Sequence, residues 1–126
     1  MGLIKTFNQF INENLSHTTY SDVIDNMEAG TDLLIDVPED VRIVLQHGYL
    51  GQVNIRCGLI LVSCDDRNEK TYKFYQYRGE EDEFLTLDEL SNEDKKSAMD
   101  FLQTHEYEEF EPTNFTPDWV WDKLNN

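Results

Sequence analysis

VNIRCGLILVSC, residues 53–64, has the alternating pattern of a long β-strand. Five apolar side chains share one face of that strand: Val53, Ile55, Cys57, Leu59 and Leu61. The second half of the segment, residues 59–62, is apolar on both faces, which is typical of a strand covered on both sides. We therefore predict that this segment is the central strand of a sheet and that the rest of the chain packs around it.

Further strand patterns lie before and after this segment. Residues 33–37 form a short apolar run that Pro38 ends, and residues 41–45 alternate in hydrophobicity. A glycine-containing turn over residues 47–51 follows them, and a polar turn over residues 65–69 leads to another strand over residues 71–77. Because these connections are short, we expect the strands to pair antiparallel.

Helical patterns precede the strands. Residues 3–15 carry apolar side chains at helical spacing, which predicts a first amphipathic helix. A second helix is expected after Thr19 or Ser21, either of which can cap it, and Gly30 is placed to end it. Its apolar stripe consists of Tyr20, Val23, Ile24 and Met27.

Two more helices are expected after the strands. Ser91 with Asp94 matches a capping box and predicts a helix from about Asn92 to His105, and Thr86 with Glu89 matches the same pattern. The pair Thr116-Pro117 is a start signal for a last short helix. The sequence thus predicts a single α+β domain over residues 1–126: an antiparallel meander of three to four strands with two N-terminal and two C-terminal helices packed on it.

The chain is strongly and unevenly acidic. Its 126 residues include 26 acids and 10 bases, a formal net charge of −16, and residues 78–126 alone hold 15 acids and 4 bases. Such a charge repels nucleic acid and anionic lipid and attracts basic proteins, so we expect no direct nucleic-acid binding and a basic protein partner. No apolar run approaches the ~20 residues of a membrane span, and we expect a cytoplasmic location.

The sequence offers little for catalysis or cofactors. His17, His47 and His105 are scattered, and a cysteine in the middle of a strand is far more often a core residue than a nucleophile. Cys57 and Cys64 would lie about 23 Å apart in one strand at ~3.3 Å per residue, and their odd spacing puts them on opposite faces, so we expect free thiols. We predict no enzyme and no cofactor; an enzyme with an unrecognised acidic site remains an alternative.

Two further patterns have ordinary explanations. The turn with Asp65, Asp66 and Glu69 lacks the glycine and the later glutamate of a calcium-binding loop, so we predict a solvated hairpin turn and no metal site. The aromatic side chains of residues 72–77 could stack bases beside Lys70, Lys73 and Arg78, but the preference of aromatic residues for strands explains them better.

The acidic C-terminal third is the feature that indicates a function. Carboxylates displayed on a folded surface can imitate a row of phosphates and capture a protein that binds DNA through Lys and Arg; the alternative is a solvated face that only keeps the chain soluble. Phe110, Phe115, Trp119 and Trp121 could anchor such an interface, and the two tryptophans cannot share one helical face. The partner-binding candidates are Glu80, Glu81, Asp82, Glu83, Glu106, Glu108, Glu109, Glu111 and Trp121.

Residues 5–13, KTFNQFINE, resemble the opening of the internal head proteins of T4-type bacteriophages. In that family a short Lys-Thr-aromatic leader directs the protein to the capsid, and the phage prohead protease cuts after the glutamate of an Ile/Leu-x-Glu site. The resemblance implies cleavage after Glu13 and a packaged body of residues 14–126. It also implies a phage-encoded protein, located in the cytoplasm of a host cell or in a virion, in a family of which some members disarm host restriction enzymes. An amphipathic helix that packs on its own domain is the alternative for the same residues.

Overall fold

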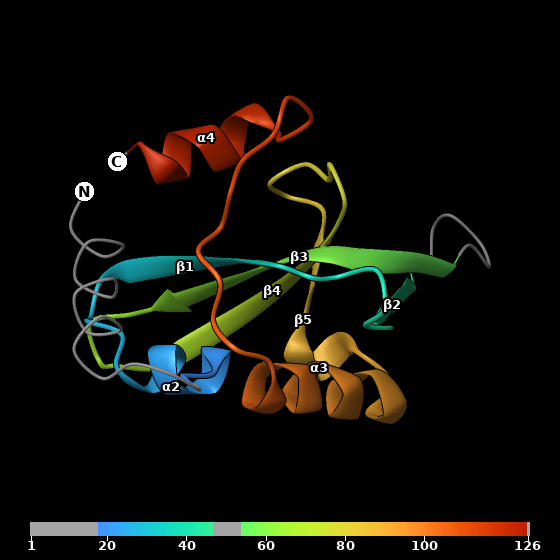
Figure 1. Cartoon of the computed structure of the whole chain (residues 1–126), viewed down its shortest axis with the longest axis horizontal. Helices are drawn as coiled ribbons and strands as arrows, with labels where there is room; N and C mark the ends of the chain where they lie inside the picture. The colour runs from blue at the N-terminus through green and yellow to red at the C-terminus, as the bar shows by residue number, and fades with distance from the viewer. Residues whose placement is uncertain (1–17, 47–53, 126) are drawn as a thin grey trace.

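The computed structural model describes residues 18–46 and 54–125. Three α-helices, one 3₁₀ helix and five strands lie in these ranges (Figure 1). In chain order they are α2 (Tyr20–Asp25), β1 (Thr31–Asp36), β2 (Val44–Gln46), β3 (Asn54–Cys64), β4 (Lys70–Gln76), β5 (Phe84–Thr86), η2 (Leu87–Glu89), α3 (Asn92–Thr104) and α4 (Asp118–Leu124).

β3 is the central strand, as the sequence predicts. It pairs antiparallel with β1, β2 and β4, and β4 pairs antiparallel with β5, so the path across the sheet is β1-β3-β4-β5 with β2 on β3. The antiparallel α+β class is therefore confirmed. The sheet has five strands, more than the three to four expected, because the short strand Phe84–Thr86 adds to β4 through pairs such as Lys73 with Thr86.

A β-bulge in β3 overturns the expected alternation of side chains. The register shifts between Cys57 and Leu59, where Gly58 is the extra residue. The space above Gly58 is taken by Tyr77, whose Cβ would lie 2.9 Å from a Cβ built on the glycine. As a result Cys57 packs on one face of the sheet and Leu59 on the other, whereas the strict period of two put them together.

The bulge also corrects the expectation for the two cysteines. Cys57 and Cys64 belong to the same buried cluster and lie on the same face, because the extra residue changes the parity of their spacing. Both are buried free thiols. The two thiols are free, as expected from the separation of the cysteines along one strand. The prediction that the cysteines lie on opposite faces is wrong.

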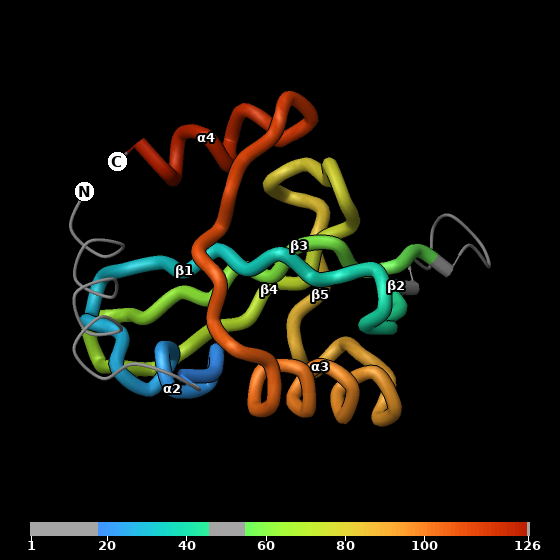
Figure 2. The backbone as a smooth tube through the Cα atoms, in the orientation of Figure 1, coloured from blue at the N-terminus to red at the C-terminus, as the bar shows by residue number. Residues whose placement is uncertain are grey.

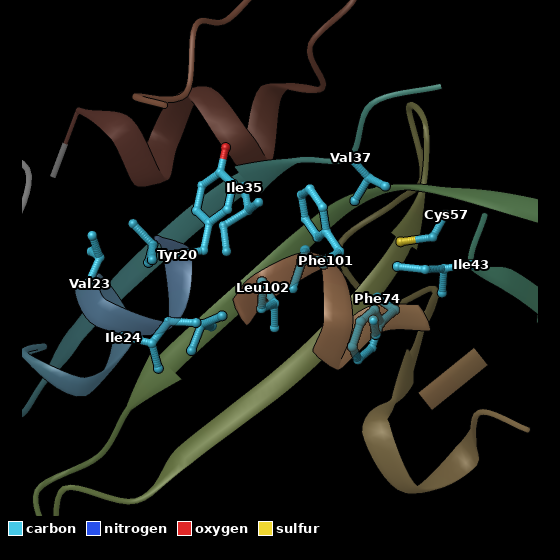
Figure 3. Close-up of a cluster of buried hydrophobic side chains, with 14 of the residues drawn as sticks. Tyr20, Val23, Ile24, Ile35, Val37, Ile43, Cys57, Phe74, Phe101 and Leu102 are labelled. Carbon is cyan, nitrogen blue, oxygen red and sulfur yellow. The ribbon is translucent and has the colours of Figure 1, made fainter. Parts of the chain in front are cut away.

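The main core lies between one face of the sheet and helices α2 and α3 (Figures 1 and 3). The predicted stripe of α2 and the predicted buried face of α3 (Ala98, Phe101 and Leu102) are confirmed. The rings of Tyr20 and Phe101 lie 5.4 Å apart, measured between centroids, and so connect the two helices on this face of the sheet. From the sheet the core receives Leu33, Ile35, Ile43, Cys57, Ile60, Val62 and Phe74.

A smaller core lies on the opposite face of the sheet, under α4 (Figure 1). Its sheet residues are Leu34, Leu59, Leu61 and Tyr75, and α4 contributes Trp119 and Val120. Phe74 and Tyr75 are both fully buried on opposite faces, so strand packing accounts for these two aromatic side chains. The sheet is thus a middle layer between two unequal layers of helix.

Local signals set most helix ends. Thr19 and Asp22 form the capping box of α2, and the side chain of Ser91 accepts from the amide of Asp94 at the start of α3. α2 ends at Asp25 instead of near Gly30, and α4 is capped by Pro117, one residue later than expected. Gly30 instead has a φ of +82°, which a turn into β1 requires. The predicted helix over residues 3–15 and the turn over residues 47–51 lie outside the described residues.

Candidate acidic interface

The segment that joins α3 to α4 carries half of the candidate carboxylates. This segment, residues 106–117, is here called the strap; it runs from one layer of helix past β1 to the other (Figure 2). Its start is held by backbone pairing: the Tyr107 amide donates to the Thr18 carbonyl at 2.7 Å, and the Tyr20 amide donates to the His105 carbonyl at 3.2 Å. This pairing leads the acidic run over residues 106–111 along the outside of the molecule.

The first part of the strap closes over the end of β1 and forms an acidic hollow. Its five lining residues are Tyr20, Asp36, Glu108, Glu109 and Glu111, around about 410 Å³. Burial of the carboxyl group raises the pKa of Asp36, and the charges of Glu108 and Glu111 raise it further. The three carboxylates are therefore close enough to repel one another. A carboxyl with a raised pKa is what the enzyme alternative requires, and a positively charged side chain nearby would relieve the same repulsion.

A second group of carboxylates gathers beside α4. Glu80, Glu81 and Asp82 of the loop before β5 line a wide, open depression of about 980 Å³ together with Asp118 and Asp122 of α4. Lys123 pairs with Glu81 at 3.9 Å and with Asp32 of β1 at 3.5 Å. One lysine therefore ties the acidic loop, the sheet and α4 together, while most of the surrounding charge is negative.

A narrow groove connects the two acidic sites. It encloses about 60 Å³ and shares Asp36 and Glu111 with the hollow. It shares Arg78, Phe115, Thr116 and Pro117 with the depression. Its floor includes Gly58 and Leu59, at the bulge of β3. The three concavities thus form one line from the start of the strap to α4.

The predicted partner-binding residues fall into three groups. Glu80, Glu81 and Asp82 line the depression, and Glu108, Glu109 and Glu111 line the hollow. Glu83, Glu106 and Trp121 line neither of these two sites. Trp121 is 39% exposed on α4 while Trp119 is 9% exposed, which confirms that the two tryptophans do not share a face. Glu13, the predicted cleavage position, lies outside the described residues.

Sequence reasoning missed three carboxylates of this surface. Asp36 ends β1, and Asp118 and Asp122 lie one helical turn apart on α4. All three are distant in sequence from the acidic runs that they join, and no local pattern distinguishes them from other surface acids. Only the folding of β1, the strap and α4 against one another reveals them.

The described residues have the following geometry at the places where other kinds of site could lie. The Cys57 thiol is buried and donates to the Leu59 carbonyl, and burial raises its pKa to about 12, which disfavours a nucleophilic thiolate at neutral pH. In the hairpin turn the Asp65 carboxylate accepts from the amides of Arg67 and Glu69. Within residues 18–46 and 54–125 no group of three or more His, Cys, Asp or Glu side chains could hold a metal ion. In those same ranges no helix is long and apolar enough to cross a membrane.

Comparison with protein-family models, with curated proteins and with solved structures finds no match for this chain.

Proposed function

We propose that this protein is a non-enzymatic, phage-encoded binding protein whose acidic surface captures and blocks a basic host protein, one that binds nucleic acid or serves in defence. The binding surface is the line of concavities along the strap and α4. Its carboxylates take the place of the phosphates that such a partner binds.

The observation that carries this proposal is the convergence of carboxylates from separate segments. Asp36 comes from β1 and Glu108 and Glu111 come from the strap, and all three line one hollow, where burial and then the charges of the two glutamates raise the pKa of Asp36. A fold that needs acids only for solubility gains from keeping them apart, because like charges in proximity destabilise it. A partner with Lys or Arg side chains relieves that repulsion. The clustering of like charges that destabilises the free protein therefore favours binding of the partner.

The test compares two triple variants with a matched control. One neutralises the strap (E108Q, E109Q and E111Q), and one neutralises the loop (E80Q, E81Q and D82N). The control removes the same charge from η2 and α3 (D88N, E93Q and D100N), at positions that line none of the three concavities. The tagged proteins are incubated with bacterial lysate at 50 and 500 mM salt. The expected result is a captured basic protein at low salt that is released at high salt.

The variants then decide whether the surface is specific. Three partly screened charge pairs at about 0.5 kcal/mol each correspond to roughly a tenfold loss of affinity in the strap and loop variants. The control variant should change affinity by less than about twofold. Equal losses in all three variants would mean that net charge alone drives binding, and binding that ignores both salt and the variants would contradict the proposal.

The likeness of residues 5–13 to the leaders of phage internal head proteins supports a second candidate function, a virion internal or assembly protein processed after Glu13. Mass spectrometry of purified particles tests it. A particle-associated form that begins at Asn14 would support packaging, and particles that contain no peptide of this protein would contradict it.

A further inference from the structure

Two aromatic rings are exposed in the groove between the acidic sites. Tyr77 is 55% exposed and Phe115 is 57% exposed, although the two cores of the described residues bury other large aromatic side chains almost completely. Tyr77 follows β4, and Phe115 lies on the strap just before α4. Both side chains line the groove, so two segments separated by more than thirty residues present apolar ring surface at one place.

The protein itself already stacks a guanidinium group on these rings. The guanidinium carbon of Arg78 lies 4.0 Å from the ring centroid of Phe115 and 5.4 Å from that of Tyr77. These distances are within the range of cation–π attraction, and a planar guanidinium stacks on an aromatic face better than an ammonium does. Since both rings remain more than half exposed beside Arg78, part of their surface is open to a second side chain.

Carboxylates lie at both ends of the groove. Asp36 and Glu111 line it on the side of the hollow, and Glu80 and Asp82 line the depression that it joins. Aromatic faces bordered by carboxylates suit arginine in particular, because its side chain can stack and donate two parallel hydrogen bonds to a carboxylate. A lysine would gain the charge attraction and lose most of the stacking.

We propose that the groove binds an arginine side chain from an extended basic segment of the partner, with its guanidinium stacked on Tyr77 and Phe115 and paired with Asp36 and Glu111. This inference rests on the proposed function, because the partner is again basic. It adds that the surface distinguishes arginine from lysine and that the aromatic groove, not the charge, makes the distinction.

The experiment titrates hexa-arginine and hexa-lysine peptides into the full chain by calorimetry at 50 and 300 mM salt. The two probes carry equal charge from their side chains, so electrostatics alone predicts similar affinities. We expect the arginine peptide to bind about five- to tenfold more tightly. The Y77A/F115A double variant should reduce that ratio to less than twofold while the affinity for the lysine peptide stays within twofold of the wild type. Q103A removes an exposed side chain of α3 that lines none of the three concavities and should leave the ratio unchanged.

The outcomes separate the two proposals. Salt-dependent binding of both peptides with equal affinity would overturn the arginine groove and leave the acidic interface standing. Absence of salt-dependent binding by either peptide would overturn the acidic interface as well. A ratio that persists in the double variant, or that Q103A abolishes, would place the preference for arginine outside the groove and contradict the inference.

Discussion

The indole Nε1 of Trp119 donates a hydrogen bond of 2.9 Å to the carbonyl oxygen of Gly79, forty residues earlier in the chain. The Trp119 ring also lies on Tyr75 of β4, at a centroid distance of 4.7 Å. A seven-residue helix such as α4 is unstable alone in water, so its position depends on this packing. The bond connects α4 to the residue that precedes the acidic loop, and thereby holds the two sources of carboxylates in the depression next to each other.

We predict that Trp119 anchors α4. W119A should lower the free energy of unfolding by about 3–5 kcal/mol, because it empties the smaller core. W119F keeps an aromatic ring but leaves the buried Gly79 carbonyl without its donor, and should cost at least about 1–3 kcal/mol. Urea denaturation followed by far-UV circular dichroism measures both values. W121F, at an exposed position of the same helix, should stay within about 0.5 kcal/mol of the wild type, and a loss comparable to that of W119F would contradict this account.

We predict that Gly58 tolerates no side chain. G58A would place a Cβ 2.9 Å from the Cβ and 3.0 Å from the Cα of Tyr77, so backbone must move. The expected loss is about 1–3 kcal/mol, as for other overpacked sites. S63A, in the same strand, is the control and should be nearly neutral. Thermal denaturation compares the two variants, and equal midpoints would mean that the bulge relaxes freely.

We predict that Asp94 fastens α3 to β2. Its carboxylate accepts from the hydroxyl of Ser91 within the cap of α3 and from the backbone amide of Val44 at 3.1 Å. D94A removes both acceptors and should cost about 1–3 kcal/mol, since the Val44 amide is partly buried. Hydrogen exchange provides the specific measurement: the Val44 amide should exchange faster in D94A and keep most of its protection in D94N, which retains an acceptor oxygen. Unchanged exchange in D94A would refute the link.

We predict a pH-dependent cost of ionising Asp36. Its pKa is raised in the folded protein by burial and by Glu108 and Glu111, so the folded state holds the proton more tightly than the unfolded state does. The stability that this proton confers is complete below about pH 4 and declines as pH rises through the folded-state pKa. D36N should therefore raise the melting temperature at pH 7 and have little effect at pH 3.5.

The size of this effect is limited by solvent. Although its carboxyl group is partly buried in the hollow, Asp36 remains accessible to solvent, which screens like-charge repulsion. We therefore expect a gain of less than about 1 kcal/mol at low salt and a smaller one at high salt. E39Q neutralises an exposed carboxylate outside the hollow and controls for net charge. A destabilising D36N at neutral pH would show that the carboxylate makes a favourable contact instead.

Much of the fold could be predicted from local patterns. Thr19, Ser91 and their acidic partners mark the starts of α2 and α3, because a cap is formed by residues three positions apart. The central position of β3 follows from its apolar residues on both faces. β5 was not predicted because its three residues, which follow an acidic loop, are too few to show a strand pattern. They form a strand by pairing with β4.

The candidate site could be predicted only in part. The carboxylates of the strap and of the loop are visible as acidic runs, whereas their grouping with Asp36 and with α4 is not. Phe115 was among the aromatic residues expected to anchor an interface, whereas the exposed Tyr77 had no signal, since aromatic residues within a predicted strand usually indicate core. The phase of β3 was predicted wrongly because strict alternation was assumed through Gly58, although a glycine within a strand often marks a bulge.

The sequence by itself determined the class of the fold, the central strand, the caps of the helices and the acidic excess of the C-terminal third, since each of these depends on residues within a few positions of one another. Only the tertiary structure decided which face each side chain of β3 takes, which acids gather and where aromatic rings stay exposed. These features depend on contacts between distant segments, such as Tyr77 above Gly58 and Glu111 beside Asp36. Packing and charge repulsion act between residues that are close in space. The positions of these side chains are therefore determined only when β1, the strap and α4 pack together in the folded protein.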